Sequence, residues 1–481
     1  MSPVLRLLPA LVLIVTTACT TPAPGAGSFG SACAAAGTDL SYAEGITATV
    51  ATAEIVPAAG EVPEHCRVTG TIDPSVRFTL KLPLAAAWNQ RFAVIGCAST
   101  CGYEQGEECD PGVLSGVATA TSDAGHRATD DLFRWAVEQP GTFDDWAFRS
   151  THVTAVVAKA LTEQVYARPI GHSYFTGCSN GGRQGLIQAQ RYPADFDGIQ
   201  VDSPALDALG HAAASWPWTV GAAFTPDGAA RLTRETVDAV SRTVMAQCDG
   251  RDGIADGLVA DPLSCTPDLG AAGLTPDQRD IAERLYAAPT NSAGPILPRG
   301  LLPGSESVEW AEQFATDRSF VAESARSAIR YALYGPPLGA EAQVADWSPE
   351  DVPARVAGYR AAADATANLD AFRARGGKLL VTVPLGDTVV SPIATLSWMD
   401  RVQAHHPDAD DFVRLFALPG IGHCWGGHYG ATPQTIQQLV SWVEQGTAPD
   451  TVDLWFGDRR VPTFPYPRTT VYREGSYVPS A

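Results

Sequence analysis

The chain has 481 residues, of which 45% are hydrophobic and 18% charged, and its formal net charge is −20 at pH 7. This length exceeds what one ordinary hydrophobic core accommodates, so we expect two domains or one large domain with a sizeable insertion. The acidic balance excludes a nucleic-acid partner, because binding to a phosphate backbone needs clustered Lys and Arg. Nothing in the sequence indicates an obligate protein partner.

The N-terminal residues 1–19 have the pattern of a secretory signal peptide. They contain one arginine, an apolar run over 7–15 and then small residues. Cleavage before Cys19 would allow a lipid to be attached to its thiol, and 20–30 has the composition of a flexible tether. We therefore expect an exported bacterial protein, either secreted or held at the cell surface as a lipoprotein.

Up to residue 205 the sequence alternates strand patterns with helix patterns. In chain order, the predicted elements are two strands within 77–96, a strand within 116–126, a helix over 151–166, a strand over 172–176 and a helix over 182–191. The order strand, glycine-rich turn, helix at 172–191 is typical of an α/β protein.

The alternation stops after 205 and returns at 377. Between 206 and 372 the sequence predicts helices, such as 276–286 and 319–334, and a loop rich in Asp-Gly steps. From 377 onwards the predicted elements are a strand over 378–385, a helix over 393–403, a strand over 412–420 and a helix over 433–444. This pattern predicts an α/β core formed by 31–205 and 373–481, with one large inserted domain over 206–372.

The turn at Gly177-Cys178-Ser179-Asn180-Gly181 has the spacing of a hydrolase nucleophile elbow. Two further residues complete a Ser-Asp-His order, each after a predicted strand: Asp387 and then His423. In this arrangement Ser179 would attack an acyl carbon, His423 would take its proton and Asp387 would orient the imidazole. His428, five residues further on, is the alternative base.

An acyl-transfer site also needs donors for the oxyanion. The elbow positions the backbone N–H of Asn180 as one of them. The second should come from the loop that follows the strand ending near Gly96, at Cys97 or Ala98.

The candidate nucleophile and base each have a cysteine beside them: Cys178 precedes Ser179, and Cys424 follows His423. If serine and histidine lie within hydrogen-bonding reach, their neighbours approach the Cα separation of about 4.4–6.8 Å that a disulfide tolerates. A Cys178–Cys424 bridge would then fix the nucleophile and the base relative to each other.

This combination of Gly-Cys-Ser-x-Gly, Gly-Asp and His-Cys resembles the tannase and feruloyl esterase family, as do 177–199, 369–380 and 442–452. The resemblance implies an α/β-hydrolase core with the insertion as a lid. It also implies a serine esterase acting on esters of aromatic acids. Feruloyl or other hydroxycinnamoyl esters are the first expectation and galloyl esters the second, with terephthalate monoesters as a related alternative. An anionic substrate would require a cation in the lid, for which Arg318, Arg326 and Arg330 are the candidates.

The Asp-Gly loop at 249–258 crowds hard oxygen ligands of the kind that calcium prefers. The resemblance implies a structural Ca²⁺ ion held by three carboxylates and two backbone carbonyls, here those of Asp249, Asp252, Ile254, Asp256 and Leu258. Two further disulfides are expected, Cys248–Cys265 around this loop and Cys33–Cys66 near the N-terminus.

The loop 96–109 departs from the family pattern, because three cysteines replace its glycines. Pairing among Cys97, Cys101 and Cys109 stays open, with Cys101–Cys109 as one candidate. The altered loop is the one feature that favours a different class of function, a non-catalytic surface lipoprotein that is stabilised by calcium and binds phenolic or polysaccharide material.

Overall fold

The computed structural model describes residues 26–103, 106–207, 210–331, 337–425 and 435–480. The predicted signal peptide, Cys19, most of the predicted tether and the alternative base His428 lie outside these ranges. Among the described residues, no helix has both the length and the apolar character needed to cross a bilayer.

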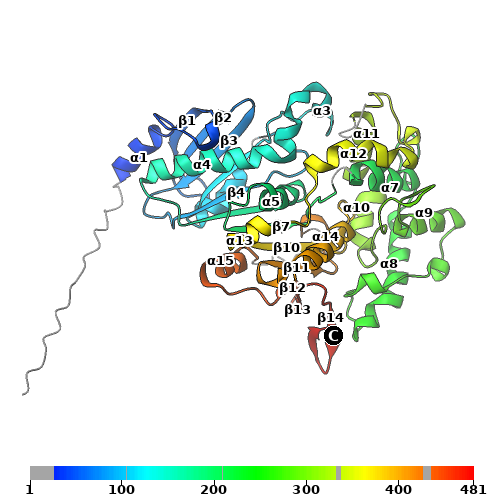
Figure 1. Ribbon diagram of the computed structural model, residues 1–481. Helices are drawn as coiled ribbons and strands as arrows, with labels where there is room; N and C mark the ends of the chain where they lie inside the picture. Colours follow the sequence, from blue (N-terminus) through cyan, green and yellow to red (C-terminus); the bar gives the residue numbers. More distant parts are fainter. Residues whose placement is uncertain (1–25, 104–105, 208–209, 332–336, 426–434, 481) are drawn as a thin grey trace, which may run out of the picture.

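One large sheet forms the centre of the molecule (Figure 1). Its strands, in spatial order, are β1 (Ala48–Val56), β2 (His65–Ile72), β3 (Val76–Pro83), β5 (Ala118–Ser122), β4 (Arg91–Ile95), β6 (His172–Cys178), β7 (Gly198–Asp202), β10 (Lys378–Pro384) and β11 (Val413–Leu418). Pairings from β1 to β5 are antiparallel, and all those from β5 to β11 are parallel. The carboxyl ends of the parallel strands therefore meet at one edge of the sheet, where α/β proteins bind ligands.

Helices pack on this sheet because its parallel strands are buried on both faces. Those that contact it are α1 (Ala26–Ala34), α2 (Asp110–Leu114), α4 (Ser150–Tyr166), α5 (Asn180–Arg191), α14 (Pro392–His405) and α15 (Thr435–Gln445). Two smaller helices are α3 (Trp135–Glu138) and α13 (Asp370–Ala374). The arrangement is the α/β fold class that the sequence predicts.

A largely helical segment, called the insertion below, separates β7 from β10, which pair directly. It contains α7 (Trp216–Ala223), α8 (Arg234–Cys248), α9 (Pro276–Tyr286), α10 (Ala311–Phe314), α11 (Phe320–Tyr331), α12 (Val352–Ala363) and the short pair β8 (Thr290–Asn291) and β9 (Gly294–Pro295). These helices gather on one side of the molecule, at the right in Figure 1, away from β1 to β3. The proposed boundaries at 206 and 372 stay a prediction.

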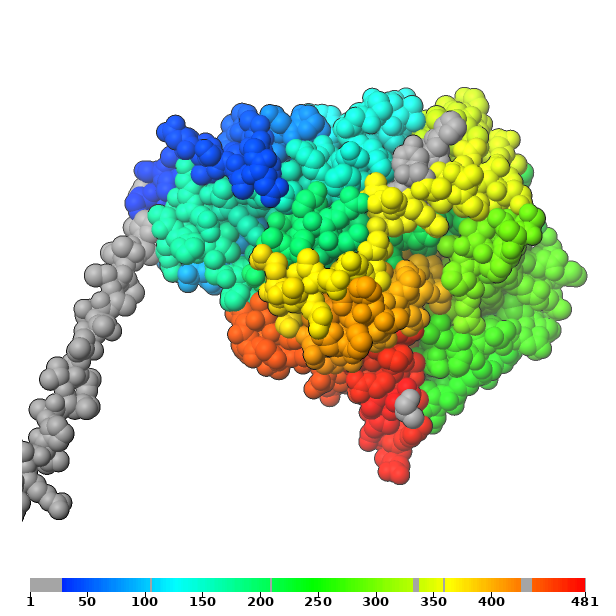
Figure 2. Space-filling model, in the orientation of Figure 1, coloured from blue at the N-terminus to red at the C-terminus, as the bar shows by residue number. Residues whose placement is uncertain are grey.

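The C-terminal segment forms two hairpins, β12 (Val452–Phe456) with β13 (Arg459–Thr463) and β14 (Thr470–Arg473) with β15 (Ser476–Pro479). In the space-filling view this red segment lies against the green insertion (Figure 2). Arg459 and Tyr477 both bind Asp256 of the Asp-Gly loop there. The end of the chain is therefore tied to the insertion.

Candidate active site

Ser179 lies in a tight turn between β6 and α5, with φ 60° and ψ −121°. A positive φ is strained for a residue with a side chain and is typical of functional turns. A Cβ on Gly177 would lie 2.6 Å from the backbone carbon of Gly181, and one on Gly181 would lie 3.0 Å from the backbone of Gly96. These close approaches explain the glycines on either side of the serine. The turn has the form of a nucleophile elbow.

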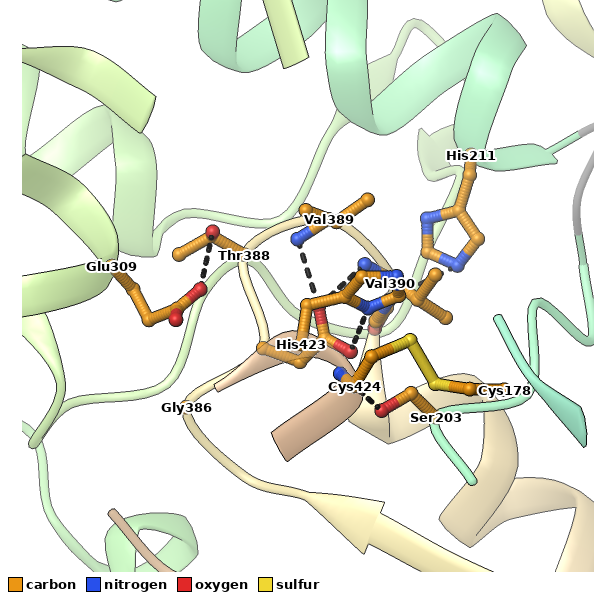
Figure 3. A network of polar contacts seen from close by, with 12 residues as sticks. Cys178, Ser203, His211, Glu309, Gly386, Thr388, Val389, Val390, His423 and Cys424 are labelled. Atoms are coloured by element: carbon orange, nitrogen blue, oxygen red, sulfur yellow. Dashed lines mark hydrogen bonds and ion pairs between the residues drawn. A yellow bond between two sulfur atoms is a disulfide. The ribbon is translucent and has the colours of Figure 1, made fainter. Parts of the chain in front are cut away.

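His423 and Asp387 form an ion pair at the ends of neighbouring strands. Nδ1 of His423 lies 2.7 Å from Oδ2 of Asp387, which is 3% exposed (Figure 3). The other oxygen, Oδ1, accepts hydrogen bonds from the backbone N–H groups of Val389 and Val390 at 2.9 and 2.8 Å. Asp387 is thereby held as an acceptor, and it fixes the orientation of the imidazole.

A disulfide joins the serine turn to the histidine loop. Cys178 and Cys424 are bridged with their Cα atoms 5.8 Å apart, as the sequence predicts. The backbone N–H of Cys424 also donates to Oγ of Ser203 at 3.1 Å, next to the carboxyl end of β7 (Figure 3). The residues adjacent to Ser179 and His423 are therefore covalently tied.

A second carboxylate, that of Glu309 in the insertion, lies behind the ion pair. Its Oε2 accepts a hydrogen bond from Oγ1 of Thr388 at 3.1 Å (Figure 3). A Cβ on Gly422 would lie 1.7 Å from its Oε1, so Glu309 packs directly against the backbone before His423. The sequence analysis missed this residue because no motif marks it; only the folded insertion brings it to the histidine loop.

The charges around His423 set its protonation behaviour. Burial lowers the pKa of its imidazole, but the charge of Asp387, their hydrogen bond and the charge of Glu309 together raise the pKa above 6.5. Burial and the nearby charge of Asp387 raise the pKa of Glu309 to about 7. The imidazolium form, which appears when a base accepts a proton, is thus favoured at this position.

The structure settles the pairing that the sequence leaves open in the cysteine loop. Cys97 is bridged to Cys101, not Cys101 to Cys109. The N–H of Cys101 donates to the carbonyl of Ala98, which turns the chain back onto Cys97, whereas Cys109 lies at the start of α2 as a buried thiol. The N–H of Cys97 donates to Oε1 of Gln184 at 3.1 Å. That N–H is already paired, which argues against Cys97 as an oxyanion donor.

Ser179 and Asn180 lie at the wall of a pocket with mainly aromatic and aliphatic sides. Its aromatic side chains are Phe133, Trp146, Trp216 and Phe320, and its polar ones include His211 and Ser324 of the insertion. None of the described residues that line it is Lys, Arg, Asp or Glu. The pocket therefore suits a flat, uncharged group beside the serine.

None of the three predicted lid cations lines this pocket. Arg318 is exposed on the surface. Arg326 lines a different cavity, next to Arg231, and Arg330 lies 3.8 Å from Asp131. The internal segments outside the described ranges contain no Lys or Arg in their sequence.

The Asp-Gly loop follows α8 and is closed by the predicted Cys248–Cys265 bridge. Asp252 Oδ1 accepts from the N–H of Ile254 and Asp256 Oδ1 from that of Leu258, both at 3.1 Å, while Asp249 Oδ1 accepts from the N–H of Asp256 at 3.0 Å. Oδ2 of Asp252 is buried and has no hydrogen-bond partner among the described residues. Burial and the charges of Asp256 and Asp249 raise the pKa of Asp252. Its second oxygen is thus open to a cation.

The carboxylate of Asp256 is less available to a cation than that of Asp252. Its Oδ2 lies 2.9 Å from Nη1 of Arg459 and 2.5 Å from the Tyr477 hydroxyl. The carboxylate oxygens of the three aspartates do not all lie within 4.8 Å of one another. Among the described residues, the one group of His, Cys, Asp or Glu side chains whose ligand atoms lie that close together is Asp370, His405 and His406.

The third predicted bridge, Cys33–Cys66, joins α1 to β2.

The chain is similar to known proteins over most of its length. The sequence profile of the family described as tannase and feruloyl esterase matches residues 60–283 and 335–481. An uncharacterized esterase of Xanthomonas campestris is 30% identical to the chain over 93% of its length and 86% of the relative's own. The mono(2-hydroxyethyl) terephthalate hydrolase of Piscinibacter sakaiensis is 28% identical over 86% of the chain and 83% of that enzyme.

The fold also matches a solved structure. Feruloyl esterase B from Aspergillus oryzae superimposes with a TM-score of 0.81 and 23% identity, covering 94% of this chain and all of that one. This likeness confirms the predicted α/β-hydrolase fold. The protein is a carboxylic-ester hydrolase, and the chain belongs to the tannase and feruloyl esterase family.

Proposed function

We propose that the protein is an exported serine esterase in which Ser179 is the nucleophile, His423 the base and Asp387 the group that orients the base. The observation that carries this proposal is the disulfide between the neighbours of Ser179 and His423, together with the 2.7 Å ion pair of His423 with Asp387. A strained serine turn at an apolar pocket adds support.

In this mechanism His423 takes the proton of Ser179 as Oγ attacks the ester carbonyl. The collapsing intermediate expels the alcohol, which receives that proton, and leaves an acyl-serine. Water then attacks in the same way and releases the acid. The N–H of Asn180, at the start of α5, and that of Ala98 are the proposed donors to the oxyanion.

The proposed substrates are esters of uncharged aromatic acids, with hydroxycinnamoyl esters such as feruloyl esters first and galloyl esters second. The aromatic walls of the pocket favour a flat acyl group. A terephthalate monoester carries a carboxylate, and the described pocket residues offer no cation to pair with it. We therefore place this substrate last, although the Piscinibacter relative is named for it.

A structural Ca²⁺ ion is part of the proposal. Asp249, Asp252 and Asp256 fit the ion in kind, because calcium prefers carboxylate and carbonyl oxygens and because Asp252 Oδ2 is buried without a partner. Carbonyls of Ile254 and Leu258 would complete the set. The ion would neutralise clustered charge in the insertion and stabilise the contact with the C-terminal hairpins, with no part in the ester chemistry.

The proposed location is outside the cytoplasm. Four disulfides lie in the described residues, and such bridges persist in oxidising compartments. The N-terminal pattern supports export, with Cys19 as the residue that a lipid anchor would use. Release of the protein from membranes by Cys19→Ser would test the anchor separately.

The test is hydrolysis of methyl ferulate, methyl gallate and mono(2-hydroxyethyl) terephthalate by the wild type and by Ser179→Ala. We expect turnover of methyl ferulate that the substitution abolishes, and labelling of the wild type alone by an active-site serine probe. No turnover of any ester, together with no labelling, would replace the proposal with the non-catalytic binding protein.

A further inference from the structure

Three buried polar atoms on residues that line the pocket beside Ser179 have no hydrogen-bond partner among the described residues. They are Nδ1 of His211, Nε1 of Trp146 and Oγ of Ser324. Buried polar groups in folded proteins are nearly always paired, because an unpaired one loses its bonds to water without replacement. Unpaired atoms also occur elsewhere in this chain, at Thr154 for example, but these three share one pocket.

The hydrogen-bonding state of His211 follows from its surroundings. The backbone N–H of Ser391 donates to Nε2 of His211 at 3.1 Å, so that nitrogen carries a lone pair and no proton. Burial lowers the pKa of the imidazole, which keeps it neutral. The proton of the neutral ring is therefore on Nδ1, which becomes a donor. Val389 and Val390, the two residues before Ser391, also line the pocket.

The other two groups are held firmly in the wall. Trp146 lies on the π-helical turn Asp145–Arg149, and the buried guanidinium of Arg183 donates to its carbonyl at 2.8 Å and stacks 4.2 Å from its ring centroid. Ser324 is fully buried on α11. His211 begins a second π-helical turn, His211–Ser215, and such turns often occur at functional sites.

The other tryptophan of this pocket, Trp216, shows that an indole here can be paired internally. Nε1 of Trp216 donates to the carbonyl of Val389 at 2.8 Å. Of the two indole N–H groups on residues that line the pocket, that of Trp216 is hydrogen-bonded inside the protein, whereas that of Trp146 has no partner among the described residues.

We propose that His211, Trp146 and Ser324 bind the oxygen substituents on the aromatic ring of the acid, so that the enzyme prefers hydroxylated or methoxylated acids to unsubstituted ones. This inference rests on the serine esterase function proposed above. In such an ester the carbonyl oxygen faces the oxyanion donors and the ester oxygen faces His423, which leaves the ring oxygens for these groups. Two N–H donors and one hydroxyl match uncharged phenol and methoxyl oxygens.

The test compares kcat/KM for methyl ferulate with that for methyl cinnamate, which has no ring oxygen. We expect the wild type to prefer ferulate. Ser324→Ala should lose about tenfold on ferulate, the effect of one lost hydrogen bond, and less than about twofold on cinnamate. Because the removed hydroxyl has no internal partner, this variant should melt no lower than the wild type.

Thr154→Val is the matched control, since it removes an equally buried, unpaired hydroxyl from α4, outside the pocket. It should leave the ratio of the two rates unchanged. Equal losses on both esters for Ser324→Ala, or a wild type without preference, would overturn the inference.

A second measurement separates this inference from the proposed function. Binding of ferulic and cinnamic acid to Ser179→Ala, measured by calorimetry, needs no turnover. Tighter binding of ferulic acid that Ser324→Ala weakens supports the polar pocket even if no ester is hydrolysed, whereas equal binding of the two acids contradicts it.

Discussion

The ion pair of Asp387 with His423 and the pocket that faces Ser179 differ in how their polar atoms are bonded. In the ion pair, both oxygens of Asp387 are bonded inside the protein, one to His423 and the other to two backbone N–H groups. In the pocket, three buried polar atoms have no partner among the described residues. Groups that must keep one geometry through every turnover gain from internal partners, whereas groups that recognise a substrate must stay open to it.

The largest expected effect comes from removing the ion pair between Asp387 and His423. Asp387→Asn replaces an acceptor with an amide that favours the wrong tautomer of His423, so we expect kcat to fall roughly 10³- to 10⁴-fold, by analogy with serine protease triads. Steady-state kinetics on methyl ferulate measures it. Asp400→Asn, which changes an exposed aspartate of α14, should leave kcat unchanged. An Asp387→Asn variant that keeps more than a tenth of the wild-type kcat contradicts the assigned role.

Next in size is the loss of the bridge between the Ser179 turn and the His423 loop. Cys178→Ser with Cys424→Ser should lower stability by about 5 kcal/mol on the chain-entropy model, and Cys33→Ser with Cys66→Ser by about 4 kcal/mol. Only the first pair should also reduce kcat, by about tenfold or more, because only that bridge fixes the nucleophile relative to the base.

Denaturant unfolding and kinetics under non-reducing conditions, on both double variants, separate the two effects. Equal kcat in both variants would show that the Cys178–Cys424 bridge contributes stability alone.

The approach of Asp387 to His423 was predictable from the sequence, whereas the lining of the pocket beside Ser179 was not, for a physical reason. Ser179, Asp387 and His423 each follow a strand, and parallel strands bring their carboxyl ends to one edge, so their chain order carries the geometry. His211 and Ser324 lie in the insertion, where contacts depend on how helices pack. No local pattern marks such contacts.

The loop 96–109 shows the same limit. Its cysteines were visible, but the pairing depends on a turn at Ala98 and on the burial of Cys109 beside β3 and β5. The backbone N–H of Cys97, a candidate oxyanion donor from the sequence, instead donates to the side chain of Gln184 from α5. A single sequence cannot place such long-range partners.

A smaller effect, on the pH dependence of activity, is expected from Glu309 of the insertion. The proposed base, His423, accepts a proton only when neutral, so we expect activity to fall as pH drops through its pKa, which Asp387 and Glu309 raise. Glu309→Gln removes one of these charges and should move the acid limb of the kcat/KM profile to lower pH. The groups facing Glu309 are Thr388, Asp387, His423 and Glu312.

Glu312→Gln, an exposed neighbour on α10, is the control and should leave the limb in place. A limb that stays put in Glu309→Gln, or moves to higher pH, contradicts the electrostatic role.

The smallest effect on activity is expected from calcium. A chelator should lower the melting temperature by several degrees, because loss of an ion present at about 100 times its Kd costs about 2.7 kcal/mol, and should leave kcat at 25 °C unchanged. Asp252→Asn should abolish the sensitivity to chelator. Asp261→Asn, just after this loop and before Cys265, should keep it. Calorimetric melting with and without chelator decides, and a wild type that chelator does not affect would remove calcium from the account.

The most direct single measurement is a crystal structure of Ser179→Ala with methyl ferulate bound. We predict the ester carbonyl next to residue 179 and the ring oxygens within hydrogen-bonding distance of His211 Nδ1, Trp146 Nε1 or Ser324 Oγ. A ring that points its oxygens to solvent, with these three atoms still unpaired, would contradict it.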